Sequence, residues 1–317
     1  MIPWHFNMED GQMKRINIGN SGLIASEIVL GCMRISEMSV SELSRYIDEA
    51  LEAGITMFDH ADIYGKGRCE ELFGEVFASR PHLRERIHIQ SKCSIRDGYY
   101  DLSKEHILTS VDGILKRLQT DYLDMLLLHR PDTLMELEEV AEAFDCLHAS
   151  GKVRHFGVSN FNSMQIELLQ AYVKQPIIAN QMQFSIMHAN LVTSGIQANT
   201  LFDGAPNRDG HILEYCRLKQ ITIQAWSPFQ YGFFEGVFID NEQFPEVNEV
   251  LGRLAEEKGV SKSAIAVAWI LRHPANMQVI VGTTNSARLK DICQASYVQL
   301  SRQEWYEIYR AAGHRLP

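Results

Sequence analysis

The 317-residue sequence predicts an α/β protein with a single (β/α)8 TIM barrel and an N-terminal β-hairpin. Three observations predict this fold class. Short apolar, β-branched runs alternate with amphipathic segments, eight such pairs follow one another, and no change in composition divides them. Residues 1–317 are therefore expected to form one domain, in which residues 1–12 are poorly ordered. A doubly wound open sheet is the alternative, because buried parallel strands have the same sequence pattern in both folds.

The chain before the barrel, Lys14–Ser26, is expected to form a two-stranded hairpin that turns at residues 20–22 and could plug one barrel end. Each predicted barrel strand is a short apolar run that ends in polar residues or glycine. The eight strands are expected at Ile28–Met33, Ile55–Ala61, Ile87–Cys93, Tyr122–His129, His155–Asn160, Ile177–Phe184, Ile221–Pro228 and Met277–Thr283.

The predicted helices carry apolar residues on one face. In Ser103–Thr120 the residues at 107, 111, 114, 115 and 118 are apolar, which is the spacing of one buried helix face. Ser39–Gly54 and Glu136–Gly151 each end at a glycine, where a left-handed C-cap is typical. A last helix is expected at Ser301–Ala312.

Two longer segments depart from this alternation. Ser185–Gly210 is polar and has no helical period, and Gln230–Gln243 is rich in aromatic residues. Both follow the carboxyl ends of predicted strands, where barrels keep their active-site loops. We therefore expect them to cover the substrate and the cofactor.

Composition limits the function classes. A net charge of −10 disfavours nucleic acid and anionic membranes as partners, although it does not exclude one local basic pocket. The N-terminus has no secretory signal, and no stretch approaches the roughly 18–20 apolar residues of a membrane span. The six cysteines are scattered without C-x-x-C spacing, which favours reduced thiols in a cytoplasmic protein.

Four polar residues lie at or just beyond the carboxyl ends of neighbouring predicted strands. Asp59, Lys92 and His129 each come directly after an apolar run, and Tyr64 lies just beyond the first of these runs. Each alone has an ordinary explanation, such as a helix cap, a satisfied core histidine or a turn residue. A lone buried lysine, however, is costly, and three accidents of this kind are improbable. Because strand carboxyl ends meet at one rim of a barrel, we expect the four side chains to be neighbours.

These four side chains suit proton donation to a developing alkoxide. A phenol has a pKa of about 10, which is too high for easy proton transfer at neutral pH. A cationic Lys92 is expected to lower the pKa of Tyr64, while Asp59 keeps the lysine charged and oriented. His129 is expected to polarise the substrate carbonyl with a hydrogen bond. The set contains no good nucleophile-and-base pair, so acyl transfer is disfavoured.

Five ordered segments resemble the aldo-keto reductase superfamily. They are FDHADIYG, SKC, LLLHRPD, GKVRHFGVSNF and AWSPF, of which GKVRHFGVSNF is the most specific. The resemblance extends from about residue 16 to about residue 292. It implies a barrel enzyme that transfers a hydride from a nicotinamide cofactor to an aldehyde or ketone, with NADP(H) favoured.

The resemblance also implies roles for individual residues. Asp59, Tyr64, Lys92 and His129 are the implied catalytic tetrad, with Tyr64 as the general acid. The implied cofactor-binding residues are Gly31 in the first strand, Ser159, Asn160 and Gln181 at the nicotinamide carboxamide, Trp226 against the nicotinamide ring, Ser227 and Phe229 beside the pyrophosphate, and Gly282, Thr283 and Arg288 at the adenosine end.

Two features of the sequence bear on the identity of the cofactor, a missing glycine motif and a glycine in place of a lysine. The sequence lacks a G-x-G-x-x-G motif, since Gly65-Lys66-Gly67 has no third glycine. Gly282 stands where some members of the family carry a lysine for the 2′-phosphate, and Arg288 could pair with that phosphate instead. NADP is the cofactor that the resemblance implies, and these two features leave NAD use open.

The expected substrate is a small carbonyl compound. Met33 and Arg130 follow predicted strands and are expected to border its pocket. His60 stands where many members carry threonine or serine, and it is assigned either to this pocket or to a structural role. The chain ends soon after its last predicted helix, so we expect no long C-terminal lid of the kind that some members have, and the pocket is expected either to be closed by the two longer loops or to stay open.

Two alternatives stay open. A metal-dependent barrel hydrolase could use Asp59, His60, Asp62 and His129 as ligands, although Lys92 would place a positive charge beside the metal. A catalytically idle regulatory subunit is the second, because relatives on potassium channels act as accessory proteins. We expect no metal, and the intact tetrad favours the enzyme.

Overall fold

The barrel is built from eight parallel strands in a closed ring. The computed structural model describes residues 13–203 and 210–316, so the expectation for residues 1–12 lies outside the described residues. The ring order is β10-β3-β4-β5-β6-β7-β8-β9, with β10 hydrogen-bonded to β3. The strands are β3 (Ile28–Gly31), β4 (Met57–Asp59), β5 (His88–Cys93), β6 (Leu123–Leu128), β7 (Val153–Ser159), β8 (Ile177–Gln183), β9 (Thr222–Trp226) and β10 (Met277–Val281). The predicted closed barrel is confirmed, and the open sheet is wrong.

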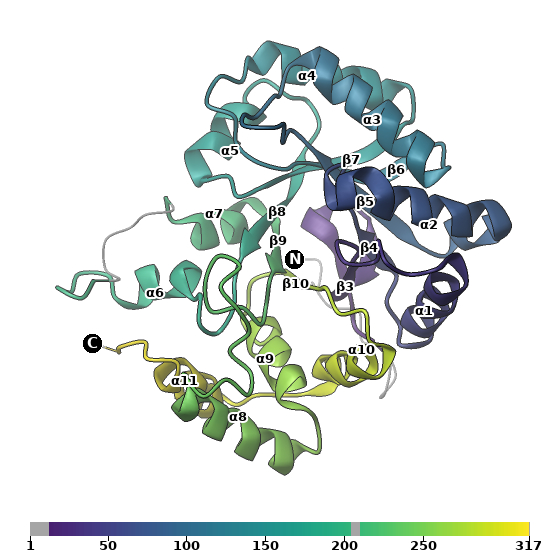
Figure 1. Ribbon diagram of the computed structural model, residues 1–317. Helices are drawn as coiled ribbons and strands as arrows, with labels where there is room; N and C mark the ends of the chain where they lie inside the picture. Colours follow the sequence, from purple (N-terminus) through teal and green to yellow (C-terminus); the bar gives the residue numbers. More distant parts are fainter. Residues whose placement is uncertain (1–12, 204–209, 317) are drawn as a thin grey trace.

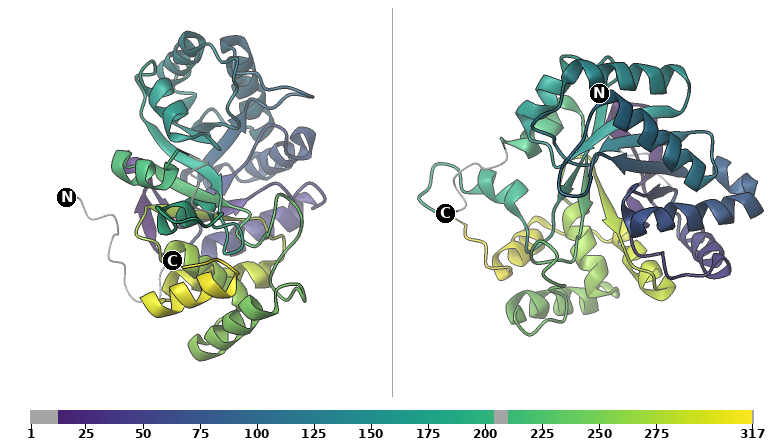
Figure 2. Two further views of the ribbon diagram at one scale, coloured as in Figure 1. Left: turned by 90° about the vertical axis from the view of Figure 1, so that its left-hand side faces the viewer. Right: turned by 45° about the horizontal axis from the view of Figure 1, so that its top comes forward.

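Helices enclose the strands, as Figure 1 shows and the two views of Figure 2 repeat from other directions. All six residues of β6 are buried, as a parallel strand covered on both faces requires. The helices are α1 (Val40–Glu52), α2 (Arg68–Ser79), α3 (Lys104–Leu118), α4 (Leu137–Ala149), α5 (Ser163–Gln170), α6 (Asn190–Ile196), α7 (Ile212–Lys219), α8 (Pro245–Lys258), α9 (Lys262–Leu271), α10 (Ser286–Cys293) and α11 (Arg302–Ala311), with short 3-10 helices η1 (Ile18–Asn20), η2 (Tyr64–Gly67), η3 (Pro81–Glu85) and η4 (Gln294–Tyr297).

The helix ends follow from the local sequence. The Ser39 side chain caps α1 by accepting a hydrogen bond from the Glu42 backbone N–H, and the Glu42 carboxylate accepts one from the Ser39 backbone N–H, which completes a capping box. Gly54 and Gly151 lie just past α1 and α4 with φ of 86° and 73°, as the predicted left-handed C-caps require. No helix among the described residues is both long and apolar enough to cross a membrane.

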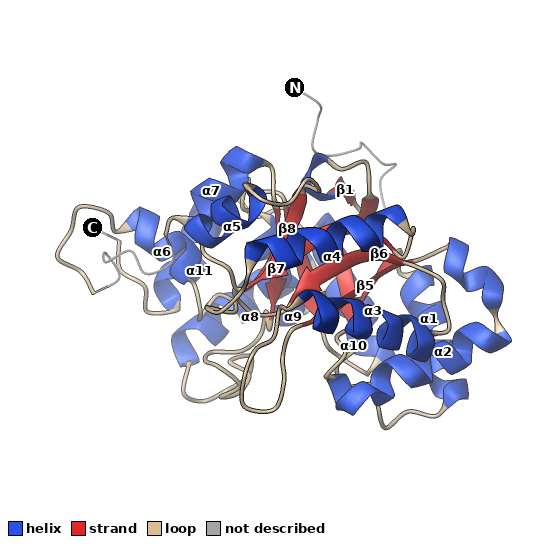
Figure 3. Ribbon diagram, turned by 90° about the horizontal axis from the view of Figure 1, so that it is seen from above, coloured by secondary structure: helices blue, strands red, loops and turns tan. Residues whose placement is uncertain are grey.

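The N-terminal hairpin plugs the barrel, as predicted. β1 (Arg15–Asn17) pairs antiparallel with β2 (Ile24–Ser26), and Ile16 and Ile18 join a hydrophobic cluster with residues of the barrel strands. Gly19 lies so close to β8 that a Cβ there would come within 2.3 Å of the Ile178 carbonyl oxygen. Figure 3 shows β1 at one end of the strands, which leaves the opposite rim, where the strands finish, for the site.

One prediction for the loops is wrong. Ser185–Gly210 was expected to lack helical structure, but residues 190–196 form α6 and bury Leu191 and Val192. The polar residues of this segment obscure the short apolar face in the sequence. Residues 204–209 of the same segment lie outside the described residues. Gln230–Gln243 is an irregular loop, as expected, with one isolated β-bridge between Gln230 and Val237.

Candidate active site

The four residues of the predicted tetrad meet at the carboxyl rim of the barrel. Asp59 is the last residue of β4, Lys92 lies near the end of β5, and His129 directly follows β6. Tyr64 opens η2, in a tight turn whose next two residues, Gly65 and Lys66, have left-handed backbones with φ of 55° and 56°. This turn brings the phenol back over the strand ends.

Lys92 is the centre of the arrangement. Its side chain is fully buried, and Nζ donates to Asp59 Oδ1 at 2.7 Å, to the His60 carbonyl oxygen at 2.7 Å and to Tyr64 Oη at 3.1 Å. Three acceptors match the three N–H groups of an ammonium, so the buried charge is completely hydrogen-bonded.

A set of buried glutamines supports Asp59, and of these only Gln181 was expected at the site from the sequence. Gln90 Nε2 donates to Asp59 Oδ1 at 2.5 Å, and Gln181 Nε2 donates to the same oxygen at 3.1 Å. Gln224 exchanges hydrogen bonds with Gln90 and donates to Gln278 Oε1 at 2.8 Å. The available signal was a glutamine in the middle of otherwise apolar strands, as in IHIQS, ITIQA and MQVIV.

The electrostatics keep Lys92 cationic and His129 neutral. Burial disfavours the charge of Lys92, but Asp59 and Tyr64 outweigh it, so the pKa of Lys92 is raised. Burial, together with the charge of Lys92, holds the pKa of His129 well below its usual value. The His129 ring lies edge-on to the Tyr64 ring, with centroids 6.1 Å apart. A neutral imidazole at this place can donate an N–H hydrogen bond without carrying charge.

The pKa of the Tyr64 phenol shifts upward overall. Burial raises the pKa of Tyr64 above its ordinary value, and the opposing pull of Lys92 does not overcome it. Lys92 lowers the pKa of Tyr64, as expected, but burial raises it by more, so the net shift is upward. The physical reason is that desolvation penalises the phenolate more than one ammonium at 3.1 Å stabilises it. Tyr64 consequently holds its proton firmly at neutral pH.

A cavity of about 1000 Å³ opens beside the tetrad. Its volume is at the upper end of the range for small-molecule sites, roughly 300–1,000 Å³. Every residue that the resemblance assigned to the cofactor lines this cavity: Gly31, Ser159, Asn160, Gln181, Trp226, Ser227, Phe229, Gly282, Thr283 and Arg288. The cavity is therefore continuous from the tetrad to the start of α10.

The strand ends turn sharply into this cavity. Asn160 follows β7 and Ser227 follows β9, both with left-handed backbones at φ of 60° and 51°. Such non-glycine conformations are costly and cluster at functional sites. Trp226 Nε1 donates to Asn160 Oδ1 at 3.3 Å, which fixes the indole beside the tetrad. Both amide hydrogens of Gln181 are used within the barrel, so its carbonyl oxygen is the group left to bind a carboxamide N–H.

The far end of the cavity suits an anionic group. The α10 N-terminus is capped by Asn285, which accepts a hydrogen bond from the Arg288 backbone. The Arg288 guanidinium has no ion pair among the described residues, and a Cβ at Gly282 would meet open space. A helix N-terminus beside an unpaired arginine is a favourable site for a phosphate.

Of the three residues expected at the substrate pocket, two line the cavity and one does not. Met33 and Arg130 line the cavity, but His60 does not. His60 is fully buried against Phe73, with ring centroids 4.7 Å apart, so its assignment to the substrate pocket is wrong. Neither of its ring nitrogens has a partner among the described residues, and burial lowers its pKa to about 3. The sequence places His60 beside Asp59, but on a strand the next side chain points to the opposite face.

Behind the strands lies a second buried acidic group. Glu70 accepts hydrogen bonds from Ser91 Oγ at 2.6 Å and from Arg117 Nε at 2.8 Å. Burial, with the charge of Glu70, raises the pKa of Asp62 to about 7. Among the described residues, no group of three histidine, cysteine or acidic side chains is placed to hold a metal ion. Asp59, a proposed metal ligand in the hydrolase alternative, is instead bound to the Lys92 ammonium.

Comparisons with known proteins agree with the geometry. The model of the Aldo/keto reductase family matches residues 27–312. The chain is 37% identical to Oxidoreductase YdhF of Escherichia coli, over 96% of this chain and 100% of that protein. It is 35% identical to 6-dehydroglucose reductase of Agrobacterium fabrum, over 95% of this chain and 98% of that protein.

A solved structure agrees as well. The crystal structure of the thermostable aldo-keto reductase Tm1743 with the inhibitor epalrestat superposes with a TM-score of 0.75. The alignment has 27% identity and covers 94% of this chain and 99% of that chain. The similarity therefore includes the whole barrel with its rim.

Proposed function

The chain belongs to the aldo/keto reductase family and is an oxidoreductase of carbonyl groups, and we propose that it reduces an aldehyde or ketone with NADPH, using Tyr64 as the proton donor. One observation carries the proposal. The Lys92 ammonium lies within hydrogen-bond distance of both Asp59 and Tyr64, beside the groove formed by the cavity of about 1000 Å³, which continues to Arg288 at the start of α10. The second 6-dehydroglucose reductase that this chain resembles, at 33% identity, supports reduction over an idle accessory role.

A reduced nicotinamide, when bound, supplies the hydride. The protein supplies the proton and the alignment. Tyr64 Oη donates its proton to the carbonyl oxygen as negative charge develops there, and the phenolate that remains is stabilised by the ammonium of Lys92. Neutral His129 donates a second hydrogen bond to the same oxygen. Asp59 compensates the lysine charge and fixes its direction.

NADPH is proposed over NADH because of the far end of the groove. Arg288 would pair with the 2′-phosphate, assisted by the N-terminus of α10. Ser159, Asn160 and Gln181 would hold the carboxamide, and Trp226 would lie against the ring. The remaining substrate-side residues, Met33 and Arg130, would border the carbonyl compound.

The proposal predicts a separation of binding from chemistry. Tyr64→Phe removes only the hydroxyl, so NADPH binding is expected to stay within about twofold of the parent while kcat falls by a factor of about 10² to 10⁴. The measurement is NADPH oxidation with a panel of aldehydes and ketones, with cofactor binding followed by titration. Lys92→Met is the companion variant and is expected to lose turnover as well. A Tyr64→Phe enzyme as active as the parent contradicts the proposal.

A further inference from the structure

Two bridges of side-chain hydrogen bonds cross the interior of the barrel beside the tetrad. In the first, Gln224 on β9 donates to Gln90 Oε1 on β5 at 2.9 Å and accepts from Gln90 Nε2 at 3.0 Å. In the second, Gln181 on β8 donates to Asp59 on β4 at 3.1 Å. The strands β5 and β9 lie opposite each other in the ring of eight, and so do β4 and β8. Both bridges therefore pass through the interior, and all four side chains are buried.

The N-terminal hairpin fixes the direction of each amide in these bridges. Gln278 on β10 donates from Nε2 to the Ser26 carbonyl oxygen of β2 at 2.8 Å, and a carbonyl oxygen can only accept. Gln278 Oε1 is therefore the group that faces Gln224, whose Nε2 donates to it at 2.8 Å. With its Nε2 used in this way, Gln224 presents Oε1 to the Nε2 groups of Gln90 and Gln181, at 3.0 Å and 3.2 Å. The hairpin thus determines which end of each amide points at the tetrad.

Both oriented amides point at a single oxygen of Asp59. Asp59 Oδ1 accepts from Gln90 Nε2 at 2.5 Å and from Gln181 Nε2 at 3.1 Å, in addition to Lys92 Nζ at 2.7 Å. The positive ends of two N–H dipoles therefore offset part of the negative potential of this carboxylate. Without the dipoles, more of that potential would reach the groups around it.

The proton donor responds to the charge of Asp59. Burial raises the pKa of Tyr64, Lys92 lowers it, and the negative charges of Asp59 and Cys32 raise it. His129, whose ring meets the phenol edge-on, is neutral and adds no charge. Any group that offsets the field of Asp59 therefore makes the phenol a better proton donor near neutral pH.

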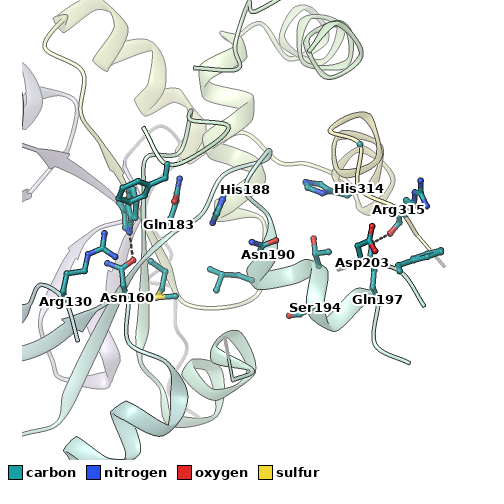
Figure 4. Close-up of a pocket in the computed structure, with 17 residues that line it drawn as sticks. Arg130, Asn160, Gln183, His188, Asn190, Ser194, Gln197, Asp203, His314 and Arg315 are labelled. Atoms are coloured by element: carbon teal, nitrogen blue, oxygen red, sulfur yellow. Dashed lines mark hydrogen bonds between the residues drawn. The ribbon is translucent and has the colours of Figure 1, made fainter. Parts of the chain in front are cut away.

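Gln183, two residues beyond Gln181 on β8, lies outside this network. It faces a second cavity, of about 590 Å³, which Figure 4 shows. Its Nε2 donates to the Gly232 carbonyl oxygen at 3.0 Å, and it makes no hydrogen bond to the interior glutamines among the described residues. The second cavity adjoins the first, and the residues that line both are Arg130, Asn160, Trp226 and Phe233. The network therefore ends at Gln181, below the cavities.

We propose that Gln224 is a positioning residue of the proton-transfer step. It directs the amide N–H groups of Gln90 and Gln181 at Asp59. Through Asp59 it governs how readily Tyr64 releases its proton. Gln224 lines neither cavity and acts only through its neighbours. This inference rests on the proposed reductase function and adds to it a residue that touches neither cofactor nor substrate.

The test is the pH dependence of a single turnover, measured as NADPH oxidation with the best aldehyde of the panel. Gln224→Met nearly keeps the side-chain volume and removes every hydrogen bond of the amide. We expect the rate constant to fall about tenfold and its alkaline limb to move up by about 0.5 to 1 pH unit, because the phenol holds its proton more tightly. The Kd for NADPH is expected to stay within about threefold, since Gln181 keeps Asp59 as its acceptor.

Thr222→Val is the matched control for a purely structural effect. Thr222 is buried on the same strand and the same face, two residues before Gln224. The substitution removes two hydrogen bonds, which Thr222 Oγ1 accepts from the Gly19 backbone N–H at 2.9 Å and from Asn276 Nδ2 at 2.7 Å. We expect this variant to lose thermal stability and to keep the pH profile of the parent.

A second variant decides the outcome if Gln224→Met does not fold. Gln90→Met removes one of the donors to Asp59 and is expected to move the alkaline limb in the same direction. An unchanged limb, or a limb at lower pH, in the folded variant overturns the inference and leaves the reductase function standing. Failure of the parent to reduce any aldehyde with NADPH, or full activity of Tyr64→Phe, overturns the proposed function itself.

Discussion

At the scale of single residues, the stability of the site depends on whether each buried charged group has hydrogen-bond partners. Lys92 uses its three N–H groups on Asp59, Tyr64 and the His60 carbonyl oxygen. Removing one partner of such a buried pair leaves an uncompensated charge and is strongly destabilising. Asp62 is the contrasting case, because its buried Oδ1 has no partner among the described residues.

Asp62 gives a prediction for pH-dependent stability. Its folded pKa of about 7 lies above its unfolded value of about 4, so in that window the folded chain holds a proton that the unfolded chain releases. The free energy of unfolding therefore falls as pH rises through the window. Asp62→Asn removes this contribution. Between about pH 5 and about pH 8, the free energy of unfolding of the variant is therefore expected to fall by about 2 kcal/mol less than that of the parent. Urea denaturation at both pH values measures it.

The control for this prediction is Asp97→Asn, on an exposed loop. It is expected to leave the pH dependence of the parent unchanged. Equal declines in the parent and in Asp62→Asn would show that Asp62 ionises at its ordinary pKa in the folded protein.

At the scale of elements, α2 and α3 are in close contact at a glycine. A Cβ at Gly74 would lie 2.1 Å from the Arg117 carbonyl oxygen, a backbone atom that cannot rotate away. Gly252 in α8 is different, because its nearest contact would be Lys262 Cε at 3.3 Å, on a flexible side chain. The same substitution should therefore have opposite effects in the two helices.

We predict that Gly74→Ala lowers the free energy of unfolding by about 2 kcal/mol, since the forced separation of α2 and α3 exceeds the gain in helix propensity. Gly252→Ala is expected to raise it by up to about 1 kcal/mol. Denaturant unfolding of both variants and the parent measures the two signs. Changes of the same sign in both variants would contradict the role assigned to the α2–α3 contact.

The sequence predicts elements well where one physical rule decides them. Apolar runs followed by polar residues located all eight strands and the rim, because parallel strands are buried on both faces and end at the site. The rule fails for α6, whose buried Leu191 and Val192 sit among polar residues. It also fails for Gln90 and Gln224, because hydrogen bonds across a barrel join residues 134 positions apart. The direction of the Tyr64 pKa shift required burial, which no local pattern contains.

At the scale of the whole molecule, the groove joins parts of the barrel that are distant in sequence. Its lining includes Gly31 of β3, Gln181 of β8 and Trp226 of β9, so a bound dinucleotide would contact strands that are distant in sequence. Anything that binds only the folded state stabilises it by mass action. The preference between two cofactors should therefore appear as a difference in how much each one stabilises the folded protein.

We predict that NADPH at about 100 times its Kd stabilises the protein by about 2.7 kcal/mol and raises Tm by about 5 °C, and that NADH at the same concentration raises it less. Arg288→Met is expected to remove the difference by lowering the NADPH effect alone. Thermal unfolding with each cofactor measures both. Equal shifts with the two cofactors in the parent would exclude the preference for NADP.

The placement of the three tryptophans among the described residues has an optical consequence. Trp269 and Trp305 are stacked, with ring centroids 4.8 Å apart and each indole N–H donating to the other's backbone oxygen. Trp226 is half-buried at the junction of the two cavities. Emission from the stacked pair is insulated from ligands, whereas emission from Trp226 is exposed to quenching by whatever occupies either cavity. The enzyme thus contains both a fluorescent reporter of its site and an internal reference against which to calibrate it.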